Sequence, residues 1–120
     1  MSEIIYLTDL SVITCIVDKE RSDAVLLAAR DVGARAAIVH SAQSWGIRER
    51  LGVLGVAVET ERDIITFMVS SDQRDLIFDA IYQTADLDAP GRGFMFITPV
   101  ERGATYIPEA VREQLGVNQE

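Results

Sequence analysis

Four segments of the chain carry the dense or alternating apolar pattern that is typical of β-strands. They are residues 12–17, 35–41, 64–69 and 94–100. Within 64–69, the odd and even positions point to opposite faces of a sheet, and both sets are mainly apolar. The pattern therefore predicts a sheet whose two faces both need to be covered.

Helical spacing of apolar residues predicts two helices between these strands, over about 22–32 and 71–85. Ser22 and Ser71 stand where an N-cap hydroxyl is expected, so each is predicted to cap its helix. A short tail helix is predicted over 108–115. The faces predicted to be buried consist of Val25, Ala29 and Val32 in the first helix, and Ile77, Ala80, Ile81 and Thr84 in the second.

The resulting order of elements is βαββαβ, which predicts an α+β protein with the ferredoxin-like sandwich. Right-handed crossovers would place both helices on one face of an antiparallel sheet. We expect oligomerisation to cover the other face; the alternative is that the N-terminal residues 4–7 pack under it. The chain is expected to form one domain over 1–120, with its core at about 12–106.

The connection over about 42–62 is the first candidate for function, because loops this long in a small domain are usually functional or disordered. Trp45 offers a flat apolar surface, and Arg48 and Arg50 offer forked donors for phosphate, carboxylate or a partner protein. The alternative interpretation is a solvated hairpin anchored by the tryptophan.

The second candidate is the turn over residues 90–93, which lies between the second helix and the last strand. Gly91 and Gly93 would let backbone N–H groups approach an anion closely, and Arg92 would supply positive charge. A glycine pair alone is weak evidence, because tight turns that lead into strands often use one.

Charge and composition exclude several classes of protein. The 120 residues carry a net charge of -8, which disfavours nucleic acid and anionic lipid as partners. The apolar runs are too short for a membrane helix, and the first residues lack the basic start of a signal peptide, so we expect a cytoplasmic protein. The single cysteine, Cys15, is expected to be a buried hydrophobic residue rather than a nucleophile.

The sequence contains no recognisable catalytic constellation, so we expect a protein that is not an enzyme. His40 is the single histidine and has no histidine or cysteine at metal-ligand spacing, which favours a structural role over a catalytic or metal site. An alternative of another class is a small enzyme that uses Arg92 and an acidic partner on a phosphorylated substrate.

Two stretches, together with the element order, resemble the PII signalling family. Trp45 and Gly46 resemble the aromatic–glycine pair at the base of the family's T-loop. Thr84 and Ala85, followed by residues 91–96, resemble its B-loop and final strand. The resemblance covers about 12–106 and is closer to the divergent PII-like branch, whose members often accompany membrane transporters.

The resemblance implies a homotrimer that binds an adenine nucleotide (ADP, AMP or ATP) in clefts between subunits and needs no other cofactor. The mobile T-loop would report occupancy to a regulated partner, for which a membrane transporter is the class implied. The nucleotide-site residues carried over are Trp45, Gly46, Arg48, Gly91, Arg92 and Gly93. The partner-binding loop comprises Ile47, Arg48, Glu49 and Arg50.

Three positions depart from the family pattern. Phe94 replaces a lysine that commonly follows the B-loop glycines, while Thr105 and Ile107 stand where the family has two arginines. Phosphate charge would then be met mainly by Arg92, which favours ADP or AMP over ATP. A CutA-like structural or metal-related trimer, which shares the fold plan without requiring a nucleotide, is the alternative.

Overall fold

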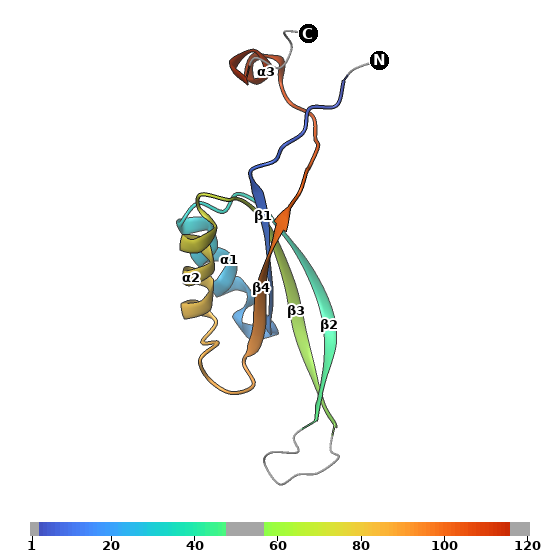
Figure 1. Ribbon diagram of the computed structural model, residues 1–120. Helices are drawn as coiled ribbons and strands as arrows, with labels where there is room; N and C mark the ends of the chain where they lie inside the picture. Colours follow the sequence, from blue (N-terminus) through green and yellow to red (C-terminus); the bar gives the residue numbers. More distant parts are fainter. Residues whose placement is uncertain (1–2, 48–56, 116–120) are drawn as a thin grey trace.

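The computed structural model describes residues 3–47 and 57–115, and within them the elements follow the order predicted from the sequence (Figure 1). A short 3-10 turn, η1 (Lys19–Arg21), joins the first strand to the first helix. The remaining elements are β1 (Leu10–Asp18), α1 (Ser22–Asp31), β2 (Ala37–Ile47), β3 (Ala57–Ser70), α2 (Arg74–Thr84), β4 (Gly93–Val100) and α3 (Glu109–Leu115).

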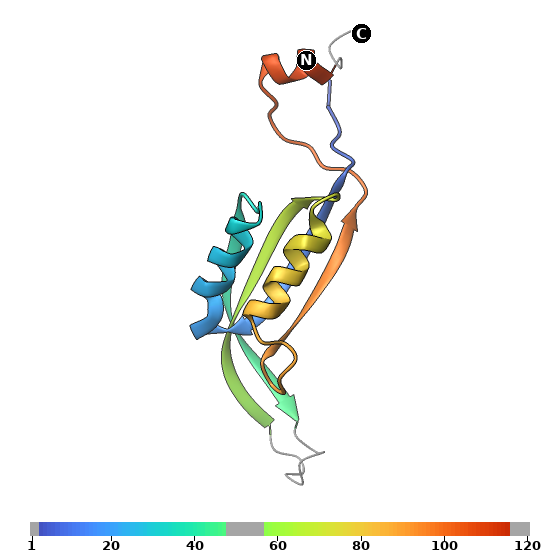
Figure 2. The ribbon, with the colours of Figure 1, turned by 90° about the vertical axis from the view of Figure 1, so that its left-hand side faces the viewer.

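The four strands form one sheet in the order β2-β3-β1-β4, and every neighbouring pair is antiparallel. Both α1 and α2 lie against the same face of this sheet (Figure 2). The predicted ferredoxin-like α+β architecture is therefore confirmed. Each strand–helix–strand crossover returns the chain to the sheet on the same side, which leaves the opposite side, here called the open face, without helices.

The core lies between the sheet and the two helices. Alternate residues of β1 are fully buried, as expected for a strand that presents one set of side chains to the helices. Full burial of one large aliphatic or aromatic side chain contributes about 1.5–3 kcal/mol to stability. The largest buried core side chains are those of Ile13, Val17, Val25, Ile65, Phe67, Ile77 and Ile81.

Cys15 is part of this core and is completely buried, which confirms the expectation of a small hydrophobic residue. Burial disfavours the thiolate and raises the pKa of the Cys15 thiol from its ordinary value of 9.0 to about 12. Stability from the neutral thiol is therefore fully present below pH 9 and is lost as the pH rises towards 12, because the unfolded chain ionises first.

We therefore predict that Cys15 resists thiol reagents in the native protein. At pH 8 a disulfide reagent such as Ellman's should modify it only as fast as the chain unfolds, and immediately after denaturant is added. Stoichiometric modification of the native chain within seconds would contradict this burial.

The serines predicted to cap the helices have other partners. Ser22 is the first residue of α1, and its hydroxyl donates a hydrogen bond to Asp63. The Ser71 hydroxyl lies 3.1 Å from that of Ser11, and α2 begins at Arg74 without a side-chain cap from its N-cap residue. The capping predictions were wrong because both hydroxyls meet polar groups from distant strands.

The prediction of a long connection over about 42–62, between the second and third strands, was also wrong. Strands β2 and β3 continue through it as a paired hairpin, with register partners from Ala37 and Phe67 to Ile47 and Ala57. The ends of that segment therefore pair as a hairpin, while the anchoring by Trp45 stays a prediction. Figure 1 shows its two strands extending beyond the helices and the rest of the sheet.

The open face carries large apolar side chains that are accessible in the single chain, beside polar residues such as His40 and Thr98. Its exposed residues include Ile38 (61%), Met68 (51%) and Phe94 (62%), and the ring of Phe96 lies 5.9 Å from that of Phe94. The N-terminal residues do not cover it. The alternative that they pack under the sheet is therefore wrong for this structure.

Instead, the two ends of the chain form a terminal arm (residues 3–9 and 101–115) that projects from one end of the sheet (Figure 1). Leu7 and Gly103 form a bridge with two backbone hydrogen bonds of 2.8 Å, and Arg102 lies over the ring of Tyr6. The radius of gyration is 18.3 Å. A compact domain of this length would have a radius of gyration of about 14 Å. The larger value arises because the terminal arm and the hairpin project from the rest of the domain.

Candidate functional site

The glycine turn (residues 90–93) lies at the end of the sheet opposite the terminal arm, where the connection from α2 enters β4 (Figure 1). Gly91 has a φ of 74° and Gly93 a φ of 147°, conformations that favour glycine. A Cβ on Gly93 would lie 2.0 Å from the carbonyl oxygen of Ile16. Both glycines are therefore required by the backbone path, and they hold Arg92 between them.

Two residues missed by the sequence analysis, Arg62 and Asp18, contact this turn. Arg62 of β3 donates a hydrogen bond from Nη2 to the carbonyl oxygen of Gly91, at 2.9 Å. The carboxylate of Asp18 lies 3.6 Å from Arg62 Nη1 and 3.9 Å from Arg92 Nη1. Asp18 and Arg62 are register partners at the ends of β1 and β3, so the sheet itself brings them together.

On the helix-covered side of the same end, Asp63 joins three elements. Its carboxylate is buried and accepts hydrogen bonds from the hydroxyls of Ser22 in α1 and Ser41 in β2, the latter at 3.2 Å. These bonds fix the base of the β2–β3 hairpin relative to α1. The neighbouring Arg62 is thereby held in register beside the glycine turn.

The structure places the other predicted site residues along the hairpin. Trp45 and Gly46 lie in β2, opposite Glu59 and Val58 of β3. Trp45 is three residues beyond Ala42, the register partner of Arg62, which corresponds to roughly 10 Å along the strand. Ile47 is the last residue of β2, while Arg48, Glu49 and Arg50 lie outside the described residues.

The two side chains considered for metal or catalytic chemistry do not converge. Cys15 faces the helices, whereas His40 is exposed opposite Ile64 on the open face. No group of three or more metal-ligating side chains occurs within residues 3–47 and 57–115. In the same part of the chain, no helix has the length and apolar character needed to cross a membrane.

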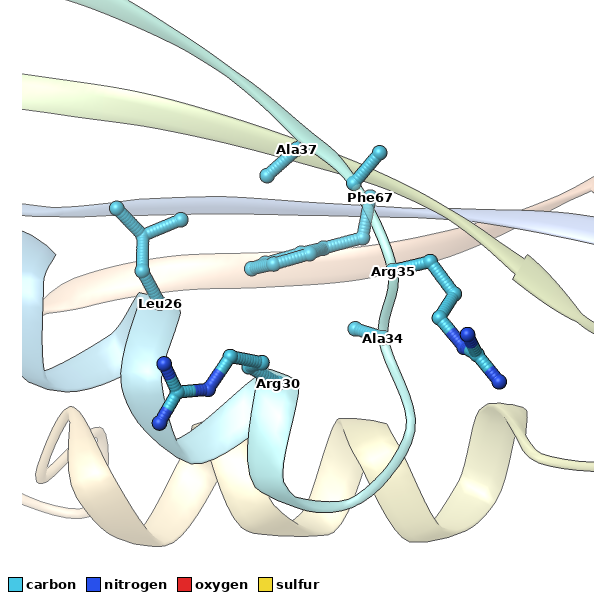
Figure 3. A pocket seen from close by; sticks show the side chains of 7 residues that line it. Leu26, Arg30, Ala34, Arg35, Ala37 and Phe67 are labelled. Atoms are coloured by element: carbon cyan, nitrogen blue, oxygen red, sulfur yellow. The ribbon is translucent and has the colours of Figure 1, made fainter.

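A hollow lies between α1 and the start of β2 (Figure 3). The start of β2 is at the other end of the sheet from the glycine turn (Figure 1). The lining of the hollow is mainly apolar, and the guanidinium groups of Arg30 and Arg35 extend in different directions from it (Figure 3). It therefore lacks the convergent polar groups of a ligand site. The lining residues are Leu26, Arg30, Ala34, Arg35, Ala36, Ala37 and Phe67.

No protein-family model and no curated protein sequence matches the chain. Comparison with solved structures does give a match, to the GlnK–ATP complex of B. subtilis, with a TM-score of 0.66. The match covers 79% of this chain and 85% of the GlnK chain, at 12% sequence identity. The chain has the PII fold. At this identity the match establishes the architecture and leaves the ligand to be argued from the residues.

On the PII fold of this chain, the positions that depart from the family pattern lie in two places. Phe94 follows the glycine turn directly and is 62% exposed on the open face. Thr105 and Ile107 belong to the terminal arm, at the other end of the sheet from the turn (Figure 1). Among the residues that the structure describes, Arg62 and Asp18 are charged groups that lie beside Arg92 at the turn.

Proposed function

We propose that this protein is a cytoplasmic, non-enzymatic, PII-like sensor that binds an adenine nucleotide and signals to a partner protein. The observation that carries the proposal is the glycine turn on a PII fold, with Arg92 held between two glycines of positive φ. Backbone N–H groups and a guanidinium are the donors that suit a phosphate. The structural match to a GlnK–ATP complex supports a nucleotide as the ligand.

The proposed assembly is a homotrimer with the nucleotide in clefts between subunits. The exposed apolar side chains of the open face support it, because exposed apolar patches mark interaction sites. Trp45 and Gly46 at the hairpin and residues 91–93 at the turn would contribute to each cleft. Residues 47–50 would contact the partner, for which a membrane transporter is the class that the family resemblance favours.

Arg92→Ala tests the nucleotide site. A charge-assisted hydrogen bond contributes about 1.5–3 kcal/mol, so we expect ADP to bind about 10- to 150-fold more weakly in a calorimetric titration. Arg92→Lys should recover only part of the affinity, because an ammonium group cannot make a two-pronged contact. Stability should barely change, since the Arg92 side chain is 41% exposed and its ion pair is long.

The matched control is Arg35→Ala, which removes an exposed arginine from the other end of the sheet and should leave ADP affinity unchanged. Equal affinities for ADP in the wild type and Arg92→Ala, with both trimeric, would show that residues 90–93 only turn the chain.

A further inference from the structure

The carboxylate of Asp18 lies between two guanidinium groups at the end of β1. Its oxygens are 3.6 Å from Arg62 Nη1 and 3.9 Å from Arg92 Nη1. Hydrogen bonds between charged groups of this kind are shorter, about 2.7–2.9 Å. Asp18 is therefore close enough to neutralise both arginines but is not locked to either by a short bond.

Arg62 is the less accessible of the two arginines, since its side chain is 13% exposed and that of Arg92 is 41% exposed. Arg62 Nη2 is committed to the carbonyl oxygen of Gly91. Its Nε is buried and has no hydrogen-bond partner among residues 3–47 and 57–115. Arg62 thus supports the turn through its hydrogen bond to Gly91, whereas the more exposed Arg92 can reach a ligand.

The position of the Asp18 side chain is not explained by helix capping. Asp18 is the N-cap residue of η1, where an aspartate carboxylate usually accepts a backbone N–H. In the described chain it makes no such bond and faces the two arginines instead. The arginines, and not the helical turn, therefore account for where this carboxylate lies.

We infer that Asp18 is a built-in counter-ion of the glycine turn, which holds Arg92 in the absence of ligand and competes with an incoming phosphate for it. The inference rests on the proposed anion-binding function of the turn. A phosphate that binds Arg92 lies close to the Asp18 carboxylate, and this like-charge repulsion weakens its binding. Asp18 thereby lowers the affinity of the site and favours release of the ligand.

Asp18→Asn tests the inference, because asparagine keeps the shape of the side chain and removes its charge. Removing a like charge at this range should tighten binding of ADP and of inorganic pyrophosphate by about 5- to 20-fold. Both ligands are titrated by calorimetry at fixed ionic strength. The matched control is Asp31→Asn, which makes the same charge change on an exposed side chain at the far end of α1 and should leave both affinities unchanged.

The outcomes separate this inference from the proposed function. Tighter pyrophosphate binding by Asp18→Asn, without binding of ADP, AMP or ATP to either protein, would uphold the counter-ion and refute the adenine-nucleotide sensor. ADP binding that Asp18→Asn leaves unchanged or weakens would refute the counter-ion alone. If neither the wild type nor Asp18→Asn binds ADP or pyrophosphate, the counter-ion inference is refuted as well.

Circular dichroism and thermal unfolding establish that the variant is folded. If Asp18→Asn does not fold, Asp18→Ser is titrated with the same expectation. Failure of both variants to fold would make Asp18 a structural residue and overturn the inference.

Discussion

Met68→Glu should convert the proposed trimer into monomers and abolish nucleotide binding. Met68 is 51% exposed on the open face, so the single chain tolerates a charge there. In the proposed trimer that face is buried against other subunits, and a buried unpaired carboxylate costs several kcal/mol in each copy. Met68 pairs with Val12, and Gly93 pairs with Val17, which places Met68 roughly 16 Å along the sheet from the glycine turn.

Because of this separation, loss of ADP binding in Met68→Glu would come from loss of the intersubunit clefts. Sedimentation velocity at micromolar concentration measures the assembly, and calorimetry measures the binding. Leu76→Glu is the matched control, since Leu76 is 59% exposed on α2, on the helix side of the sheet. A Met68→Glu protein that remains trimeric would show that the open face is not the interface.

Gly93→Ala should reduce ADP affinity more than Arg92→Ala does, by more than about 150-fold. The new Cβ would lie 2.0 Å from the Ile16 carbonyl oxygen, and the residue would keep a φ of 147° that alanine rarely adopts. The turn must move away from β1 and carry Arg92 with it. We also expect a loss of about 1–3 kcal/mol in unfolding free energy, measured by thermal or denaturant unfolding.

Gly103→Ala is the control for a glycine that tolerates a methyl group. A Cβ there would lie 3.4 Å from a side-chain carbon of Leu10, and that flexible side chain can move. Gly93→Ala with wild-type stability and affinity would contradict the strain argued for this turn.

Much of the fold could be predicted from the sequence because apolar periodicity identifies strands and helices where burial is one-sided. Residues 12–17 and 94–100 lie within β1 and β4, and Ile77 and Ile81 are buried on α2 as expected. The outer parts of β2 and β3 could not be predicted in this way. They pair with each other beyond the helices, and their residues lack the dense apolar pattern of β1.

The candidate site could be predicted only in part, and for a related reason. Residues 91–93 are contiguous and contain the glycines that the backbone requires, so they stand out in the sequence. Asp18 and Arg62 are far apart in the chain and meet only through the register of β1 with β3. Each looked like an ordinary charged residue at the end of a segment.

The central claim is that this chain binds an adenine nucleotide at the glycine turn, and calorimetric titration of the wild-type protein with ADP tests it most directly. That titration is also the reference for the Arg92 variants. We predict saturable binding with a stoichiometry of one nucleotide per chain, in a protein that sedimentation shows to be trimeric. Absence of measurable binding of ADP, AMP and ATP at millimolar concentration would contradict the account.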